Sequence, residues 1–181
     1  DLHSFPTRRS SDLSLSIFGR LSFSNTRNAI TNRTEYNAET GGQKTRPENI
    51  NGNWSFNGNA GFNTPLFWEK LMLNTNTSVG YQNHASYIYQ NKETITNSVR
   101  QTSVGERMSL TLRMGYWDIR ANGNFNFSHS KSEYVEASNQ DTYNFSYGLS
   151  STGNFENGFG FSTDIQMSSR RGYSASEMNT N

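Results

Sequence analysis

The sequence predicts an all-β fold, an antiparallel up-and-down meander of about seven long strands that forms a partial wall of a transmembrane β-barrel. Three observations predict it. Apolar and polar residues alternate with a period of two in one segment after another. The connections between these segments alternate between long and short, as in membrane barrels. Charges within the segments fall mainly on the polar side of the alternation.

Composition argues against an ordinary soluble core. Of the 181 residues only 31% are hydrophobic, while 17% are charged, so the low mean hydropathy comes from Asn, Ser, Thr and Gly. The net charge of +1 gives no electrostatic reason to expect nucleic acid as a partner. The absence of cysteine excludes disulfides and thiolate metal sites. No apolar run approaches a membrane helix, although a membrane strand needs only about 9 to 11 residues.

The N-terminal residues are treated separately from the fold. Residues 3–13, His-Ser-Phe-Pro-Thr-Arg-Arg-Ser-Ser-Asp-Leu, resemble the in-frame translation of a widely used DNA-sequencing adapter. The alternative is a genuine flexible, basic N-terminus. We therefore exclude residues 1–12 and expect residues 13–181 to form one incomplete barrel domain from a truncated reading frame, without its own start or signal peptide.

Seven alternating segments follow one another along the chain. The clearest carries Trp54, Phe56 and Phe62 on one parity and asparagine or serine on the other. One face of each strand is therefore apolar and the other polar. The segments span about 13–23, 53–63, 71–81, 108–116, 119–128, 143–149 and 159–167.

Parity predicts the short connections. Three loop residues, Glu156-Asn157-Gly158, place Phe155 opposite Phe159, whereas a two-residue loop would pair Glu156 with Phe159 and flip every side chain. The parity switch between the fourth and fifth segments requires an even loop, for which we expect Trp117-Asp118. A third short turn is expected around Pro65. Long polar loops are expected at 31–47, 82–102, 130–141 and beyond residue 170.

Charged residues test the barrel interpretation, because an Arg or Lys facing lipid at the midplane costs about 2 to 4 kcal/mol. Four strand charges share the polar parity and are expected to face the lumen: Arg20, Arg113, Arg120 and Asp164. Glu106 has the apolar parity, and we expect it where its strand leaves the bilayer. The residues expected to face lipid are Trp54, Phe56, Phe125, Phe127, Phe145 and Phe161.

No motif predicts catalysis, a metal or a cofactor. His3, His84 and His129 lack metal-ligand spacing, and we interpret His129 as a surface imidazole at a strand end. No serine has a nucleophile context, so the sequence predicts no enzyme. Arg170-Arg171 is interpreted as a solvated loop pair rather than an anion site. Trp54, Tyr116 and Trp117 could stack on sugars, but aromatic residues near barrel ends more often form the interfacial girdle.

Several segments resemble the C-terminal barrel of outer-membrane proteins related to TonB-dependent receptors, in particular SusC-like ones. They are Thr45–Trp54 (TRPENINGNW), Phe62–Leu66 (FNTPL), Tyr143–Gly148 (YNFSYG) and Ser169–Ser174 (SRRGYS). The resemblance covers about residues 13–181. It implies uptake of large nutrients (glycan, peptide or metal chelate) across the Gram-negative outer membrane. It also implies outer-membrane lipid and the TonB complex as partners, with a surface lipoprotein as a further candidate. The plug domain, the TonB-contacting segment and the final strands are not in this chain.

Two other interpretations stay open. A structural or adhesive outer-membrane barrel would use the same wall to display its long loops. A soluble β-sandwich would also show a period of two, because alternation does not distinguish lipid from a second sheet. The length of the strands and the alternating loop lengths favour the barrel.

Overall fold

The fold was analysed in a computed structural model that describes residues 15–37, 39–66, 70–90 and 92–180. It is an antiparallel β-structure with two short 3-10 turns, η2 (Glu136–Ser138) and η3 (Ser176–Met178). The strands are β1 (Ser16–Thr26), β2 (Ala29–Tyr36), β3 (Gln43–Ile50), β4 (Asn53–Pro65), β5 (Leu71–Gln90), β6 (Glu93–Met114), β7 (Trp117–Ser132), β8 (Gln140–Asn154) and β9 (Gly160–Arg171). The adapter-like segment, with the predicted start of the first strand at Leu13, lies outside the described residues.

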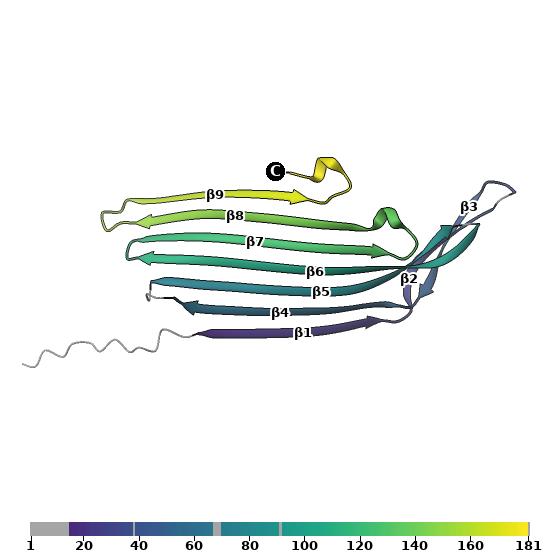
Figure 1. Ribbon diagram of the computed structural model, residues 1–181, viewed down its shortest axis with the longest axis horizontal. Helices are drawn as coiled ribbons and strands as arrows, with labels where there is room; N and C mark the ends of the chain where they lie inside the picture. Colours follow the sequence, from purple (N-terminus) through teal and green to yellow (C-terminus); the bar gives the residue numbers. More distant parts are fainter. Residues whose placement is uncertain (1–14, 38, 67–69, 91, 181) are drawn as a thin grey trace, which may run out of the picture.

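The main sheet has seven strands in the order β1-β4-β5-β6-β7-β8-β9, and β2 pairs with β3 in a separate hairpin. Figure 1 shows the seven strands side by side in a single layer, with the β2–β3 hairpin at one end of the sheet. This confirms the predicted antiparallel meander of seven strands. The sheet does not close into a barrel, and β1 and β9 form its two edges.

Register divides the sheet into two faces. Residues directly opposite one another share a face, so each alternating pattern continues across its neighbours. The face that contains the row Ala60–Thr77–Glu106–Phe125–Phe145 is called the apolar face. The face that contains the row Asn63–Asn74–Ser109–Asn122–Gly148 is called the polar face.

The short turns lie together at one end of the sheet (Figure 1). Phe155 lies opposite Phe159: its N–H donates to the Phe159 carbonyl at 2.9 Å, and their ring centroids are 6.0 Å apart. The predicted three-residue loop is therefore confirmed. The predicted Trp117-Asp118 turn is wrong by two residues, because Met114 pairs with Trp117 and the loop is Gly115-Tyr116. Gly115 has φ +64°, and glycine favours this conformation at the first position of a two-residue hairpin loop.

Two of the expected long loops are mainly strand. The segment 31–47 contains most of β2 and β3, and the segment 82–102 is the continuation of β5 and β6 up to the pair Gln90–Glu93. The period of two did not reveal these strands because their sequences are largely polar. A strand in water needs no continuous apolar face. Two hydrogen bonds connect the β2–β3 hairpin to this extension of β5 and β6. The Tyr87 hydroxyl donates to the Asn49 carbonyl (3.2 Å), and the Thr94 hydroxyl donates to the Thr34 carbonyl (3.1 Å).

The other two predicted loops are short connections with a common construction. Each contains a 3-10 turn followed by an asparagine whose side-chain oxygen accepts from the backbone where the connection begins. Asn139 accepts from Ser132 N–H at 2.7 Å, and Asn179 accepts from Tyr173 N–H at 3.0 Å. After η3 the chain returns to the edge of β9, where Thr180 and Arg170 exchange two backbone hydrogen bonds. The loop expected beyond residue 170 is therefore an ordered turn.

The described part of the chain has almost no hydrophobic core. Its only buried hydrophobic residues are Ile50 and Ala85, both near the β2–β3 hairpin. On the apolar face, by contrast, Leu21 is 75% exposed and Ile165 is 59% exposed. The sheet therefore leaves an apolar surface without a covering layer.

Candidate functional site

The polar face is the candidate functional surface, because amide and hydroxyl groups cover nearly all of it. Asn59 and Asn76 exchange two side-chain hydrogen bonds, at 2.8 and 3.2 Å. Further along the strands, the Gln82 amide donates to Gln101 (2.6 Å), and Gln101 donates to the Ser128 hydroxyl (2.9 Å). Such ladders hold the side chains in place while leaving other donors and acceptors free for a polar ligand or water.

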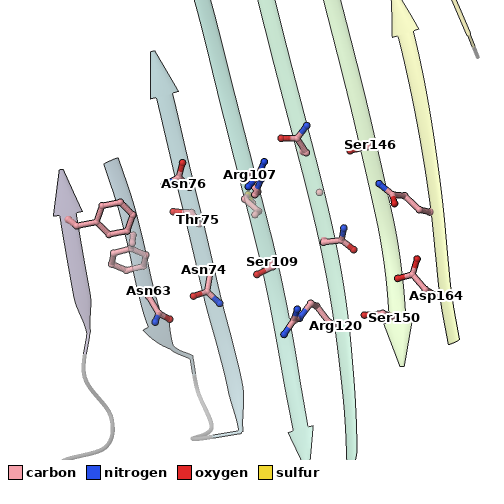
Figure 2. A pocket seen from close by; sticks show the side chains of 17 residues that line it. Asn63, Asn74, Thr75, Asn76, Arg107, Ser109, Arg120, Ser146, Ser150 and Asp164 are labelled. Atoms are coloured by element: carbon pink, nitrogen blue, oxygen red, sulfur yellow. The ribbon is translucent and has the colours of Figure 1, made fainter. Parts of the chain in front are cut away.

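A hollow of about 660 Å³ lies on this face at the middle of the sheet. Figure 2 shows its charged residues on three strands, with Arg107 on β6, Arg120 on the adjacent β7 and Asp164 on β9, beyond β8. Arg120 and Asp164 share a row with Ser150 between them, and the Arg120 Nε donates to the Thr111 hydroxyl at 3.3 Å. Two positive groups and one carboxylate thus line a hollow that asparagine and serine otherwise surround.

All four predicted lumen-facing residues lie on the polar face, but only Arg120 and Asp164 share this hollow. Arg20 lines a smaller one of about 320 Å³ with Asn57 and Asn59. Arg113 lies near the short turns, directly opposite Asp118. That this face lines a lumen stays a prediction. Arg107 was missed because the predicted strand began at Met108, although Arg107 has the same parity as Arg113.

Phe18 is the aromatic exception on the polar face. It lies opposite Gly61, and a Cβ added at Gly61 would lie 2.1 Å from the Phe18 ring. The ring therefore occupies the space over the glycine backbone, as aromatic residues do when they cover a glycine in a neighbouring strand. It lines the central hollow on the side of β1.

The polar face carries amides, hydroxyls and a few separate charges. Among the described residues there is no cluster of three or more His, Asp or Glu side chains that could hold a metal. The ion pairs of the described chain lie elsewhere. On the β2–β3 hairpin, Arg33 contacts Glu48 at 3.0 Å and Arg46 contacts Glu35 at 3.1 Å. Arg107 and Arg120 form no ion pair within the described residues, so their charges are available to an anionic or hydroxyl-rich ligand.

The six residues predicted to face lipid all lie on the apolar face, and five of them are in aromatic contacts. At the end nearer the β2–β3 hairpin, Trp54 lies 5.2 Å from Tyr81 and Phe127 lies 5.0 Å from Tyr143, between ring centroids. At the short-turn end, Trp117 lies 6.2 Å from Phe161. Aromatic residues therefore gather at both ends of this face. That the face meets lipid stays a prediction.

Glu106 is the one described charged residue between these aromatic ends on the apolar face. It lies two residue pairs inside the row of Phe127, between Thr77 and Phe125. Its carboxylate accepts a hydrogen bond from the Thr77 hydroxyl at 2.5 Å. Apolar residues continue beyond it at Val104 and Phe127. That the strand leaves the bilayer near Glu106 stays a prediction.

Two further polar contacts lie at opposite ends of the sheet. His129 lies in β7 near its end, and its Nδ1 is 2.5 Å from the Asp141 carboxylate. At the short turns the Tyr116 hydroxyl donates to Glu156, and this hydrogen bond raises the pKa of Tyr116. The second contact ties the β6–β7 turn to the β8–β9 turn.

Comparison with known proteins adds no relative to this picture. No protein-family model, curated protein or solved structure matches the chain. Within the described residues no helix is both long and apolar enough to cross a membrane. The residues themselves therefore define the class of structure, an amphipathic antiparallel β-meander with one amide-rich face and one apolar face.

Proposed function

We propose that this chain is a wall segment of an outer-membrane β-barrel related to TonB-dependent receptors, which takes up large nutrients in a Gram-negative bacterium. The observation that carries the proposal is the uncovered apolar face, bounded by aromatic residues at both ends. In water each large side chain on such a face forgoes about 1.5 to 3 kcal/mol of burial. Monomeric soluble proteins rarely expose apolar patches larger than a few hundred Å². Lipid provides the missing layer.

The spacing of the aromatic ends supports a membrane environment. Trp117 and Phe127 lie ten residues apart on β7, on the same face. At roughly 3.4 Å per residue they are about 34 Å apart along the strand. A strand tilted by about 40° converts this length into a depth of about 26 Å, which matches the apolar band of roughly 25 Å in outer-membrane barrels.

The stagger of the hairpins supports closure into a barrel, in which tilted strands must be displaced along one another in one direction. The β4–β5 hairpin ends at Pro65, in the row of Thr111 on β6. The β6–β7 hairpin ends three residues later, at Met114. The β8–β9 hairpin ends one residue beyond the row of Trp117, at Asn154. Each hairpin end is therefore displaced along the strands in the same direction as the one before it, by about one residue per strand on average.

In this proposal the polar face lines a wet interior, and the hollow with Arg107, Arg120 and Asp164 contacts the transported solute. Amides and hydroxyls suit solutes rich in hydroxyl, amide or carboxylate groups, in keeping with a glycan, a peptide or a metal chelate. The short turns lie on the periplasmic side, and the β2–β3 and β5–β6 hairpins lie outside the cell. Energised uptake requires the TonB complex, a plug domain and further strands from the rest of the protein, with a surface lipoprotein as an additional partner.

A structural or adhesive barrel is the second candidate, and the β2–β3 hairpin favours it. The hairpin carries its own ion pairs between Arg33 and Glu48 and between Arg46 and Glu35. Tyr36 and Tyr89 also connect it to β5, with ring centroids 4.6 Å apart. Such an ordered projection could serve as a contact surface for another cell or protein. A soluble β-sandwich is the third candidate and requires a second sheet over the apolar face.

Single cysteines along β7 of the complete protein test the membrane proposal, since this chain has no cysteine of its own. We expect a water-soluble maleimide to label positions 120, 122, 124 and 126, and a lipid-soluble maleimide to label positions 119, 121, 123 and 125. Labelling that alternates in this way supports the barrel. Protection of the odd positions from both reagents would instead support a covering protein layer.

Uptake separates the receptor from the structural barrel. Deleting the gene is expected to abolish energy-dependent accumulation of a large nutrient, and collapse of the proton-motive force is expected to have the same effect in the parent strain. The upstream coding sequence gives an independent check, because a receptor requires a plug domain there. Unchanged uptake of glycans, peptides and metal chelates, together with no upstream plug, would favour the structural barrel.

A further inference from the structure

Two like charges lie directly opposite each other on the apolar-face side of β6 and β7. Arg100 pairs with Lys131, and both side chains are exposed. Like charges in this position repel each other unless an anion lies between them. Among the described residues neither side chain is within ion-pair distance of a carboxylate. The repulsion is therefore left uncompensated by the chain.

The place of this pair along the strands suggests what compensates it. Arg100 lies in the row of Trp54, with Asn83 between them, and four residue pairs beyond the row of Val104 and Phe127. On β6 and β7 it therefore lies past the aromatic end of the apolar face. In a membrane barrel this is the depth of the lipid headgroups, which long basic side chains reach by extending along the protein surface.

The neighbouring charges leave the pair net positive. Two residues inward on the same face, His129 lies 2.5 Å from Asp141, so that carboxylate already has a partner. Two residues outward, Glu133 is exposed, and its N–H donates to the Ser98 carbonyl at 3.0 Å. The Glu133 side chain forms no ion pair with Lys131 within the described chain.

We propose that Arg100 and Lys131 bind the phosphate of an anionic lipid headgroup, in the leaflet on the side of the β2–β3 hairpin. Cα atoms directly opposite in an antiparallel pair are about 4.5 to 5.5 Å apart, so both side chains can converge on one phosphate. The guanidinium supplies a planar fork of donors and the ammonium a compact charge. The inference rests on the proposed membrane function, because only an embedded sheet presents this face to headgroups.

The test uses the complete protein, purified in neutral detergent with equal amounts of phosphatidylcholine and phosphatidic acid. Native mass spectrometry then counts the lipids retained. We expect the Arg100→Gln/Lys131→Gln variant to retain one phosphatidic acid fewer than the wild type. The matched control, Lys44→Gln/Lys92→Gln, removes the same charge from the hairpin tips and is expected to retain the wild-type number. An unchanged count in the first variant would overturn the site.

Further variants and the second lipid separate the ways of failing. If the neutral double variant does not fold, two other variants test the site. The Arg100→Lys/Lys131→Arg exchange is expected to keep the bound phosphatidic acid, and Lys131→Glu is expected to lose it. Any other result contradicts the site. Retention of both lipids without preference in the wild type would refute the site for an anionic headgroup but leave the membrane proposal intact. A protein that stays in solution without detergent and retains neither lipid would refute the membrane proposal itself.

Discussion

Arg113 lies directly opposite Asp118 on the polar face of the β6–β7 hairpin, while the adjacent residue Leu112 pairs with Ile119 on the apolar face. One step along β6 thus changes a charged environment into an apolar one. If the apolar face meets lipid, replacing Leu112 by Arg exposes a charge to hydrocarbon, which costs about 2 to 4 kcal/mol at the midplane and less toward the aromatic end at Trp117.

We therefore expect Leu112→Arg to reduce the yield of folded protein in lipid vesicles far more than Arg113→Leu. The measurement is the folded fraction of the complete protein after dilution from denaturant into vesicles. Equal losses for the two variants would sink the assignment of the faces.

Sidedness gives a second prediction. The connection between β7 and β8 includes η2 at the hairpin end of the sheet, whereas Asn157 lies in a short turn at the opposite end (Figure 1). An epitope inserted between Ser132 and Asn139 is expected to bind antibody on intact cells. An epitope at Asn157 is expected to be detected only after permeabilisation, and the opposite labelling would invert the topology.

Glu106 gives a third prediction, because its carboxylate lies on the apolar face beside Phe125. Replacing Glu106 by Leu is expected to raise the free energy of unfolding in lipid vesicles by up to about 2 kcal/mol, since a charge leaves the lipid boundary. Arg107→Leu on the opposite face is the control and should give no such gain. Denaturant titration of the complete protein measures both, and a loss of stability in Glu106→Leu would argue that a protein group covers this carboxylate.

Phe18 and Gly61 give a fourth prediction. Phe18→Ala is expected to cost about 1 kcal/mol of stability by uncovering the glycine backbone. Gly61→Ala is expected to be destabilising as well, because its Cβ would collide with the ring. The double variant should lose less than the two single losses together, since each change relieves the other. Strictly additive losses in denaturant titration would contradict the contact.

Period-two alternation was sufficient to predict the seven strands of the main sheet, their order and the face of most side chains in the predicted segments. Phe155 and Phe159 illustrate why, because only one loop length keeps both on the same face. The method failed where strands have no apolar side. Thr94 and Thr96 lie in the part of β6 that contacts the β2–β3 hairpin, for example through the hydrogen bond from the Thr94 hydroxyl to the Thr34 carbonyl. Such tertiary contacts do not show in the alternation of residues along one segment.

The candidate site was predictable in part for the same reason. Parity placed Arg20, Arg113, Arg120 and Asp164 on one face, but it could not tell which of them share a hollow. That depends on register across several strands, which brings Arg120 and Asp164 into one row and places Arg20 elsewhere.

The most direct test of the central claim is the behaviour of residues 13–181 on their own in water. The apolar face has no covering layer, and the edge strands β1 and β9 leave backbone groups unpaired, which favours aggregation. Refolded in plain buffer, this segment is expected to precipitate, and in detergent to stay dispersed with a β-sheet circular dichroism spectrum. In planar bilayers it is expected to give no ligand-dependent conductance. A soluble monomer that unfolds cooperatively in plain buffer would contradict the membrane account and favour the β-sandwich.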